Sequence, residues 1–199
     1  MMKFLLTFYR RGLAAGLLTG MMVVSGAALA LTPEQEMAAA LKSGQPVDVV
    51  KAFLSHTAPD KVSGAAHKLV KSDATYVSLN FDNPELKQIE PWAGTSKGPE
   101  GFISTFTRVA QYWDILDFRV SDMFASGENV AVFGRFTYRS KAVGKTFTSP
   151  FSILAKVNNG KITYFQFMED TYASASSFRS SGSWMVKTDP AKDAYKVGE

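Results

Sequence analysis

Residues 118–132 read FRVSDMFASGENVAV, and this stretch decides the fold of the chain. The apolar side chains of Phe118, Val120 and Phe124 alternate with polar ones, which is the period of a strand with one buried face. Residues 126–129 are rich in turn-forming types, and the alternation resumes after them. The stretch therefore predicts two antiparallel strands joined by a tight turn.

The strand pattern continues toward the C-terminus, and residues 115–169 as a whole are predicted as antiparallel sheet. Further turns are predicted at residues 143–145 and 158–160. The second of these reads Asn-Asn-Gly, and Asn and Gly tolerate the positive φ angles of tight hairpins. Residues 162–169 are predicted as the last strand and residues 171–180 as a short helix.

The residues before the sheet have the spacing of helices. Thr32 is a suitable N-cap for a helix that begins at Pro33, and Gln35 stands at the third helical position, so a helix is predicted from there to Gly44. Two more helices are predicted within residues 46–70, because apolar side chains recur there every three or four positions.

One strand and one longer helix complete the pattern. Residues 74–79 are predicted as a strand and residues 80–98 as an irregular stretch. From Pro99 a helix is predicted with one apolar stripe, formed by Phe102, Phe106, Val109 and Trp113. Helices grouped before a long meander predict an α+β fold, in which they cover a curved, cone-shaped antiparallel sheet that can enclose a pocket.

The composition suits one globular domain preceded by a targeting segment, with 46% hydrophobic and 20% charged residues. Residues 1–30 are predicted as a secretory signal peptide cleaved after Ala30, since basic residues precede an apolar run that ends in Ala-Leu-Ala. The apolar run is shorter than the roughly 20 residues that span a membrane, so no anchor is expected after cleavage. The mature chain is predicted to comprise an N-terminal helix (31–45), the main domain (46–180) and a flexible tail (181–199).

The predicted destination is the periplasm or the extracellular space. Arg10 and Arg11 stand before the apolar run and resemble the pair of a twin-arginine signal. Both the general secretory route and the twin-arginine route are therefore open from the sequence.

Charge and rare residue types exclude several classes of function. Three of the 22 Lys and Arg residues lie in the acid-free first thirty positions, so the rest of the chain is almost neutral and nucleic acid is not an expected partner. The absence of cysteine excludes disulfides and thiolate chemistry. The two histidines, His56 and His67, lie on or near different predicted helices, so neither a metal nor another cofactor is expected.

Three motifs in unbroken order make the chain similar to the nuclear transport factor 2-like superfamily, and most of all to its SnoaL-like and ketosteroid isomerase-related members. They are Gly94 and Gly98 before the long helix, the stretch 118–132, and the segment 160–171. The resemblance spans residues 46–178 and implies the cone-shaped fold. It does not choose a reaction, because the superfamily includes isomerases, polyketide cyclases, dehydratases, epoxide hydrolases and binding proteins.

The resemblance argues against one of these reactions. Members that hydrolyse epoxides activate water with charged residues on two strands. Matching the motifs places Gly134, Phe136 and Phe167 at those positions, and none of these side chains can transfer a proton. Epoxide hydrolysis is therefore not expected.

The same matching implies that Phe167 and Glu169 face the pocket, because side chains alternate along a strand. The full predicted lining is Tyr76, Trp92, Phe106, Trp113, Phe136, Phe151, Phe165 and Phe167. Glu169 and Asp170 are the candidate catalytic residues, since an apolar cavity raises the pKa of a carboxyl toward the range of acid–base catalysis. The alternative is that these carboxylates cap the helix that follows them.

Three functions remain open. The first is binding of a small apolar or carbonyl-bearing molecule with isomerase- or cyclase-like proton transfer, assisted by Tyr or Trp donors. The second is a non-catalytic exported ligand-binding protein. The third is a homodimeric interaction module that associates through the outer face of the sheet, where Ala131 and Phe133 are apolar.

Overall fold

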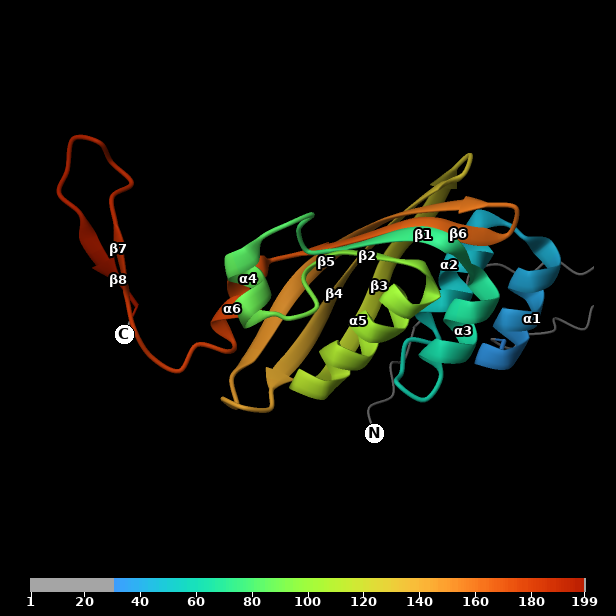
Figure 1. Ribbon diagram of the computed structural model, residues 1–199, viewed down its shortest axis with the longest axis horizontal. Coiled ribbons are helices and arrows are strands. Elements are labelled where there is room, and N and C mark those ends of the chain that lie inside the picture. The colour runs from blue at the N-terminus through green and yellow to red at the C-terminus, as the bar shows by residue number, and fades with distance from the viewer. Residues whose placement is uncertain (1–30, 199) are drawn as a thin grey trace, which may run out of the picture. The chain divides into compact units, whose positions relative to one another are not determined.

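The computed structural model describes residues 31–198, which form a mixed α+β fold with a curved six-stranded sheet (Figure 1). This confirms the predicted fold class. The predicted signal peptide and its cleavage site at Ala30 lie outside the described residues. In chain order the elements are α1 (Pro33–Ser43), α2 (Pro46–Leu54), α3 (Val62–Leu69), β1 (Val70–Ser78), α4 (Pro84–Ile89), β2 (Gly94–Lys97), α5 (Gly98–Tyr112), β3 (Trp113–Ser126), β4 (Asn129–Ser140), β5 (Thr146–Asn158), β6 (Lys161–Glu169), α6 (Thr171–Ser176), β7 (Trp184–Val186) and β8 (Tyr195–Val197).

The strand order of the large sheet is β2-β1-β6-β5-β4-β3. Strands β3 to β6 form the antiparallel meander that the sequence predicts. Strand β1 differs, because it pairs in parallel with β6 and places Tyr76 opposite Phe165. The sheet is therefore mixed rather than wholly antiparallel, and its first and last strands in the sequence are neighbours in space.

Helices pack on the sheet and enclose an aromatic core. Helix α2 contacts β3, β4, β5 and β6, while α5 contacts β1 and β3 (Figure 1). The rings of Phe53, Phe102 and Phe165 meet edge to face with centroids 5.5–5.8 Å apart. Each such pair contributes about 0.5–1.5 kcal/mol beyond simple burial. These rings fill the space between α2, α5 and β6, and a cavity remains farther along α5 and β6.

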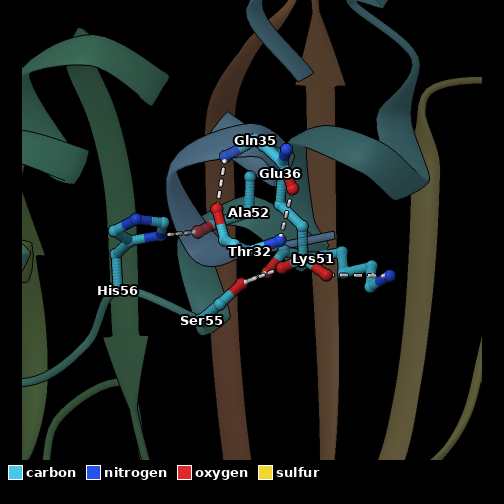
Figure 2. A network of polar contacts seen from close by, with 7 residues as sticks. All are labelled: Thr32, Gln35, Glu36, Lys51, Ala52, Ser55 and His56. Carbon is cyan, nitrogen blue, oxygen red and sulfur yellow. Dashed lines mark hydrogen bonds and ion pairs between the residues drawn. The ribbon is translucent and has the colours of Figure 1, made fainter. Parts of the chain in front are cut away.

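Polar contacts hold α1 against the end of α2 (Figure 2). The predicted capping box is present: Thr32 Oγ1 accepts from the backbone N of Gln35 at 3.3 Å, and the backbone N of Thr32 donates to Gln35 Oε1 at 2.9 Å. One residue on, Glu36 accepts from Ser55 Oγ at 2.7 Å and pairs with Lys51 Nζ at 3.1 Å. These contacts fix the C-terminal end of α2, which borders the cavity described below.

The stretch predicted as irregular contains two elements, α4 and β2. Helix α4 begins after Asn83, whose side chain accepts from the backbone N of Leu86 at 2.9 Å. Helix α5 ends at Tyr112, so Trp113, predicted as the last residue of a helical stripe, is instead the first residue of β3. The side chain of Trp113 is nevertheless buried in the common core.

The segment predicted as a flexible tail contains the two-stranded pair β7–β8, in which Met185 lies opposite Lys196. Its flexibility stays a prediction. Among residues 31–198, no helix is long and apolar enough to span a membrane.

Candidate functional site

A cavity of about 310 Å³ lies between the sheet and the helices, beside the aromatic core. This volume falls near the lower end of the range for small-ligand sites. The wall is mainly apolar, with a few hydroxyls and one carboxyl. The lining residues are Leu54, Ser55, Thr57, Ala58, Tyr76, Ser78, Leu79, Trp92, Phe106, Val109, Trp113, Ile115, Phe118, Tyr138, Phe167 and Glu169.

One exposed part of the cavity wall lies along β3. Ile115 and Phe118 line the cavity and are also 50% and 36% exposed to solvent. Because β3 is the edge strand of the sheet, no further strand covers these side chains in the described chain. A ligand that enters here meets apolar side chains first.

Aromatic rings that pack against one another form one side of the cavity. The rings of Trp92 and Trp113 meet edge to face at 4.7 Å, and Trp113 stacks on Phe178 at 5.0 Å. Trp113 Nε1 donates to Ser177 Oγ at 3.0 Å. This hydrogen bond satisfies the only polar atom of a buried indole and fixes the orientation of its ring.

The structure brings together five of the eight residues predicted as lining, namely Tyr76, Trp92, Phe106, Trp113 and Phe167. The other three, Phe136, Phe151 and Phe165, pack in the core and do not line the cavity, which corrects the prediction for them. Phe165 shares its face of β6 with Phe167, but the rings of α2 and α5 cover it. Phe136 packs between Tyr138 and Phe147, with ring centroids at 4.3 and 5.6 Å.

Glu169, the last residue of β6, forms the acidic end of the cavity. The residue is half-buried, but its Oε1 has no contact with solvent and no hydrogen-bond partner. Burial, reinforced by the charge of Asp170, raises the pKa of Glu169 from 4.5 to about 7, although the nearby Ser174 hydroxyl opposes the rise. At neutral pH this carboxyl is present in both its charged and its neutral form, so it can accept and return a proton.

Two phenols share the cavity with this carboxyl. Tyr76 of β1 and Tyr138 of β4 are both buried cavity residues. Burial, and then the negative charge of Glu169, raise the pKa of both hydroxyls above the ordinary value of 10. The phenols therefore stay protonated at physiological pH and are suited to donate hydrogen bonds to an oxygen atom of a ligand.

A second buried carboxyl, which was not predicted from the sequence, is subject to the charge of Glu169. Glu90 follows α4 and is completely buried, and neither of its carboxyl oxygens has a hydrogen-bond partner. Burial, and then the charge of Glu169, raise the pKa of Glu90 to about 8. The only signal in the sequence is a lone acid within the otherwise apolar residues 89–93.

Asp170, the other candidate catalytic residue, acts as a helix cap. Its Oδ1 accepts from the backbone N of Ala173 at 3.0 Å at the start of α6, and its own backbone N donates to Ser149 Oγ at 2.8 Å. Asp170 is exposed and does not line the cavity. The capping alternative raised by the sequence therefore describes its place in the fold.

Neither of the two histidines is among the residues that line the cavity. His56 is buried at the end of α2 with Nδ1 2.7 Å from the carbonyl oxygen of Ala52 (Figure 2). His67 is exposed and lies 3.6 Å from Glu100. Within residues 31–198, no three His, Asp or Glu side chains converge in a way that would hold a metal ion.

Residues 65–165, from α3 to β6, match the family model of the SnoaL-like domain. The chain belongs to the SnoaL-like domain family. A relative in this family is patulin synthesis protein F of Aspergillus clavatus, 48% identical over 141 residues that cover 69% of this chain and 71% of that protein. Patulin biosynthesis cluster protein F of Penicillium expansum is 46% identical over 144 residues, which cover 71% of this chain and 72% of that protein.

Solved structures share this SnoaL-like fold at lower identity. A nuclear transport factor 2-like protein of Burkholderia thailandensis has a TM-score of 0.57 at 20% identity, covering 67% of this chain and 97% of that one. TerC, co-crystallised with polyporic acid, has a TM-score of 0.53 at 21% identity, covering 65% and 97%. At these identities the comparison establishes the fold alone.

Proposed function

We propose that this SnoaL-like protein is an acid–base catalyst that moves a proton on a small carbonyl-bearing molecule held in the cavity, in an isomerase- or cyclase-type reaction. One observation carries the proposal. Glu169, whose Oε1 has no hydrogen-bond partner and whose pKa burial raises to about 7, lines an apolar cavity that also contains two phenols. A carboxyl that titrates near the working pH is suited to act both as base and as acid.

The names of the relatives support a role in small-molecule synthesis. Two proteins named for patulin synthesis match this chain at 46–48% identity, and the alignments cover about 70% of its length. We extend that role to this chain as a step in the synthesis of a small organic molecule. The cavity of about 310 Å³ fits a substrate of that size class.

The proposed reaction follows from the positions of three side chains. With Glu169 ionised, its carboxylate removes a proton from a carbon next to the substrate carbonyl. The electron pair moves to the carbonyl oxygen, and Tyr76 and Tyr138 stabilise the negative charge that develops there by donating hydrogen bonds. Glu169 then returns the proton to a different carbon. Alternatively, the enolate carbon adds to a second carbonyl carbon of the same molecule, the π bond of that carbonyl breaks, and its oxygen takes the proton back from Glu169. The proton is recovered in either case, so the step consumes no cofactor.

Exchange of carbon-bound hydrogen tests the proposal before the natural substrate is known. A panel of small cyclic ketones and enones is incubated with the protein in D₂O, and incorporation of deuterium next to the carbonyl is followed by NMR. We expect Glu169→Gln to lower the enzyme-dependent exchange rate by about 10²–10⁴-fold, because the variant cannot remove the proton. We expect Tyr138→Phe to lower it by about 10²-fold, because one donor to the enolate is lost.

Glu85→Gln is the control for this experiment. It removes an exposed carboxylate of α4 that does not line the cavity. We expect unchanged exchange in this control. Full exchange by Glu169→Gln at an unchanged melting temperature would contradict the proposal.

A non-catalytic ligand-binding protein is the second candidate. The observation that favours it is the apolar character of the wall, where Phe167 occupies a position that is charged in the epoxide hydrolase branch. Native mass spectrometry of the protein purified from its source, compared with the denatured sample, would reveal a retained molecule. A retained molecule together with no hydrogen exchange on any carbonyl compound would favour binding over catalysis.

We further propose that the chain is exported, to the periplasm or the extracellular space, and that it forms a homodimer. Export is supported by the basic, apolar and small-residue pattern of residues 1–30. The mass of the protein isolated from its source tests this directly, since cleavage after Ala30 leaves a chain that begins at Leu31. Dimerisation is taken up in the Discussion.

A further inference from the structure

Leu79 has an unusual backbone conformation at the point where β1 ends. Its φ angle is 64°, in the left-handed region that a residue with a bulky side chain rarely adopts. The backbone N of Asn80 donates to the carbonyl oxygen of Ser78 at 2.7 Å, which closes a three-residue γ-turn centred on Leu79. A γ-turn whose central residue has a positive φ is rare and strained. Glycine would form this turn freely, so the leucine keeps the conformation only because its surroundings hold it there.

The turn brings Leu79 to the cavity. Side chains alternate between the two faces of a strand, and on β1 Tyr76 and Ser78 line the cavity while Val77 is buried outside the lining. A regular continuation of β1 would place Leu79 on the face of Val77. Leu79 instead lines the cavity directly after Ser78. The strained conformation therefore has a structural effect, because it adds an apolar residue to the wall.

Leu79 also lies beside the strand that carries the candidate catalytic carboxyl. Its backbone N donates to the carbonyl oxygen of Phe167 on β6 at 2.9 Å. Phe167 precedes Glu169 by two positions on β6, and both residues line the same cavity as Leu79. A ligand placed for proton transfer at Glu169 therefore has Leu79 near its reacting end.

We propose that Leu79 is a specificity-determining residue, which limits the cavity to carbonyl compounds without a bulky group beside the carbon that reacts. The inference rests on the proposed function, because it concerns the substrate on which Glu169 acts. Moving Leu79 out of the wall would require the turn to open and its backbone hydrogen bonds to break. A close-packed wall excludes an added ring instead of yielding to it. The substrate class that fits is a compact monocyclic carbonyl compound and not a fused bicyclic one.

Two ketones of the same chemistry and of different size test the inference. Cyclohexanone is the compact probe, and 1-decalone carries a second ring fused next to its carbonyl group. Hydrogen exchange in D₂O is measured for each ketone, and the rate for 1-decalone is divided by the rate for cyclohexanone. We expect Leu79→Ala to raise this ratio by about 10–200-fold, the range that a small change of size in an apolar pocket produces.

Two further variants separate a change of specificity from a loss of stability. Leu79→Gly should raise the ratio as well, and glycine suits the positive φ of the turn. Val77→Ala is the matched control, since it truncates the neighbouring buried side chain outside the lining. It should lower the melting temperature and leave the ratio unchanged. An unchanged ratio in both Leu79 variants, or an equal rise in Val77→Ala, would overturn the inference.

Binding of the same ketones separates this inference from the proposed function. Trp92 and Trp113 line the cavity, so a ketone that enters it should quench their fluorescence. The measurement uses a Trp184→Phe background, because Trp184 is the third tryptophan of the chain and does not line the cavity. Leu79→Ala should raise the affinity for 1-decalone relative to that for cyclohexanone.

The two readouts fail in different ways. Absence of hydrogen exchange in every variant, wild type included, would refute the proposed catalysis and leave the binding measurement intact. No gain in the relative affinity for 1-decalone in Leu79→Ala, including no detectable binding of it, would overturn the role of Leu79 whether or not the protein is an enzyme.

Discussion

At the scale of single residues, the two buried carboxyls couple the stability of the fold to pH. In the folded chain the pKa of Glu169 is about 7 and that of Glu90 about 8, against an ordinary value of 4.5. Between pH 4.5 and pH 8 the unfolded chain therefore binds fewer protons than the folded one. The free energy of unfolding should be highest at mildly acidic pH and should fall as the pH rises through this window.

Glu90→Gln should weaken this dependence, because an amide has no charged form to bury. We expect its free energy of unfolding at pH 8 to exceed that of wild type by about 1–3 kcal/mol, a range that already subtracts the cost of burying an amide with few hydrogen bonds. At pH 5 we expect this advantage to disappear. Urea unfolding at the two pH values measures both differences. An identical stability difference at pH 5 and pH 8 would count against a proton held by Glu90 in the folded state.

A site residue can be predicted from the sequence when its position in the fold is set by residues close to it in the chain. Glu169 could be predicted as a cavity residue because strand alternation places it on the face of Phe167. The capping role of Asp170 could be foreseen because its partner is three residues away. Glu90 could not be predicted, since the segment around it lies near α6, which is far along the chain, and nothing within its own segment indicates this contact.

At the scale of elements, β4 crosses the middle of the meander with no room for a side chain at Gly134. A Cβ atom there would collide with the carbonyl oxygen of Arg119 on β3 and lie 2.6 Å from the ring of Phe151 on β5. That ring is itself held by Phe118, which stacks on it at 4.6 Å. The glycine thus allows an aromatic stack to lie over the strand, and Phe118 of this stack lines the cavity.

Gly134→Ala should consequently destabilise the sheet. We expect a loss of about 1–3 kcal/mol in the free energy of unfolding, because the added methyl must displace backbone or a packed ring. Gly64→Ala in α3 is the matched control, since a Cβ at Gly64 meets nothing within 4 Å. It should gain roughly 0.5–1 kcal/mol from helix propensity. Equal stability of the two variants in thermal or urea unfolding would contradict the packing argument.

Some helices and strands can be predicted from residues within or next to them, whereas others depend on partners that are distant in the sequence. Helix α1 and the hairpins of β3 to β6 follow from caps, turns and alternation within a few residues. Helix α4 and strand β2 are short and were not predicted. The parallel pairing of β1 with β6 was not predicted either, because no local signal specifies a partner that distant. The same nonlocal packing explains why Phe136, Phe151 and Phe165 were assigned to the wall of the cavity instead of to the core.

At the scale of the whole molecule, β3 exposes several large apolar side chains to solvent, which is unfavourable for a chain without a partner. It is the edge strand, and it carries unpaired backbone groups beside exposed apolar side chains. The exposed apolar residues of β3 and the adjoining strand β4 are Ile115, Leu116, Phe118, Val120, Phe124 and Phe133. Of these, Phe124 and Phe133 do not line the cavity and their rings stack at 6.2 Å. A second copy of the chain is the partner that we propose for the surface that these two rings form.

The purified protein should accordingly have twice the mass of one chain by light scattering at micromolar concentration. Phe133→Lys should yield a monomer of unchanged secondary structure, because its side chain is 43% exposed and contributes to the surface instead of the core. Lys156→Glu, an exposed charge change on β5, serves as a control that should remain dimeric. A monomeric wild type would refute this proposal.

The parallel pairing of β1 with β6 also sets the order in which the fold can form. Tyr76 cannot meet Phe165 until nearly the whole domain has been synthesised, so a nascent chain must hold β1 with one side unpaired while the meander is completed. Closing so long a loop gives the domain a high contact order, which slows folding. The end of β6 that carries Glu169 is the last part of the cavity to leave the ribosome. A chain truncated before β6 therefore lacks the carboxyl of Glu169, and it exposes an unpaired strand edge that can pair with other chains.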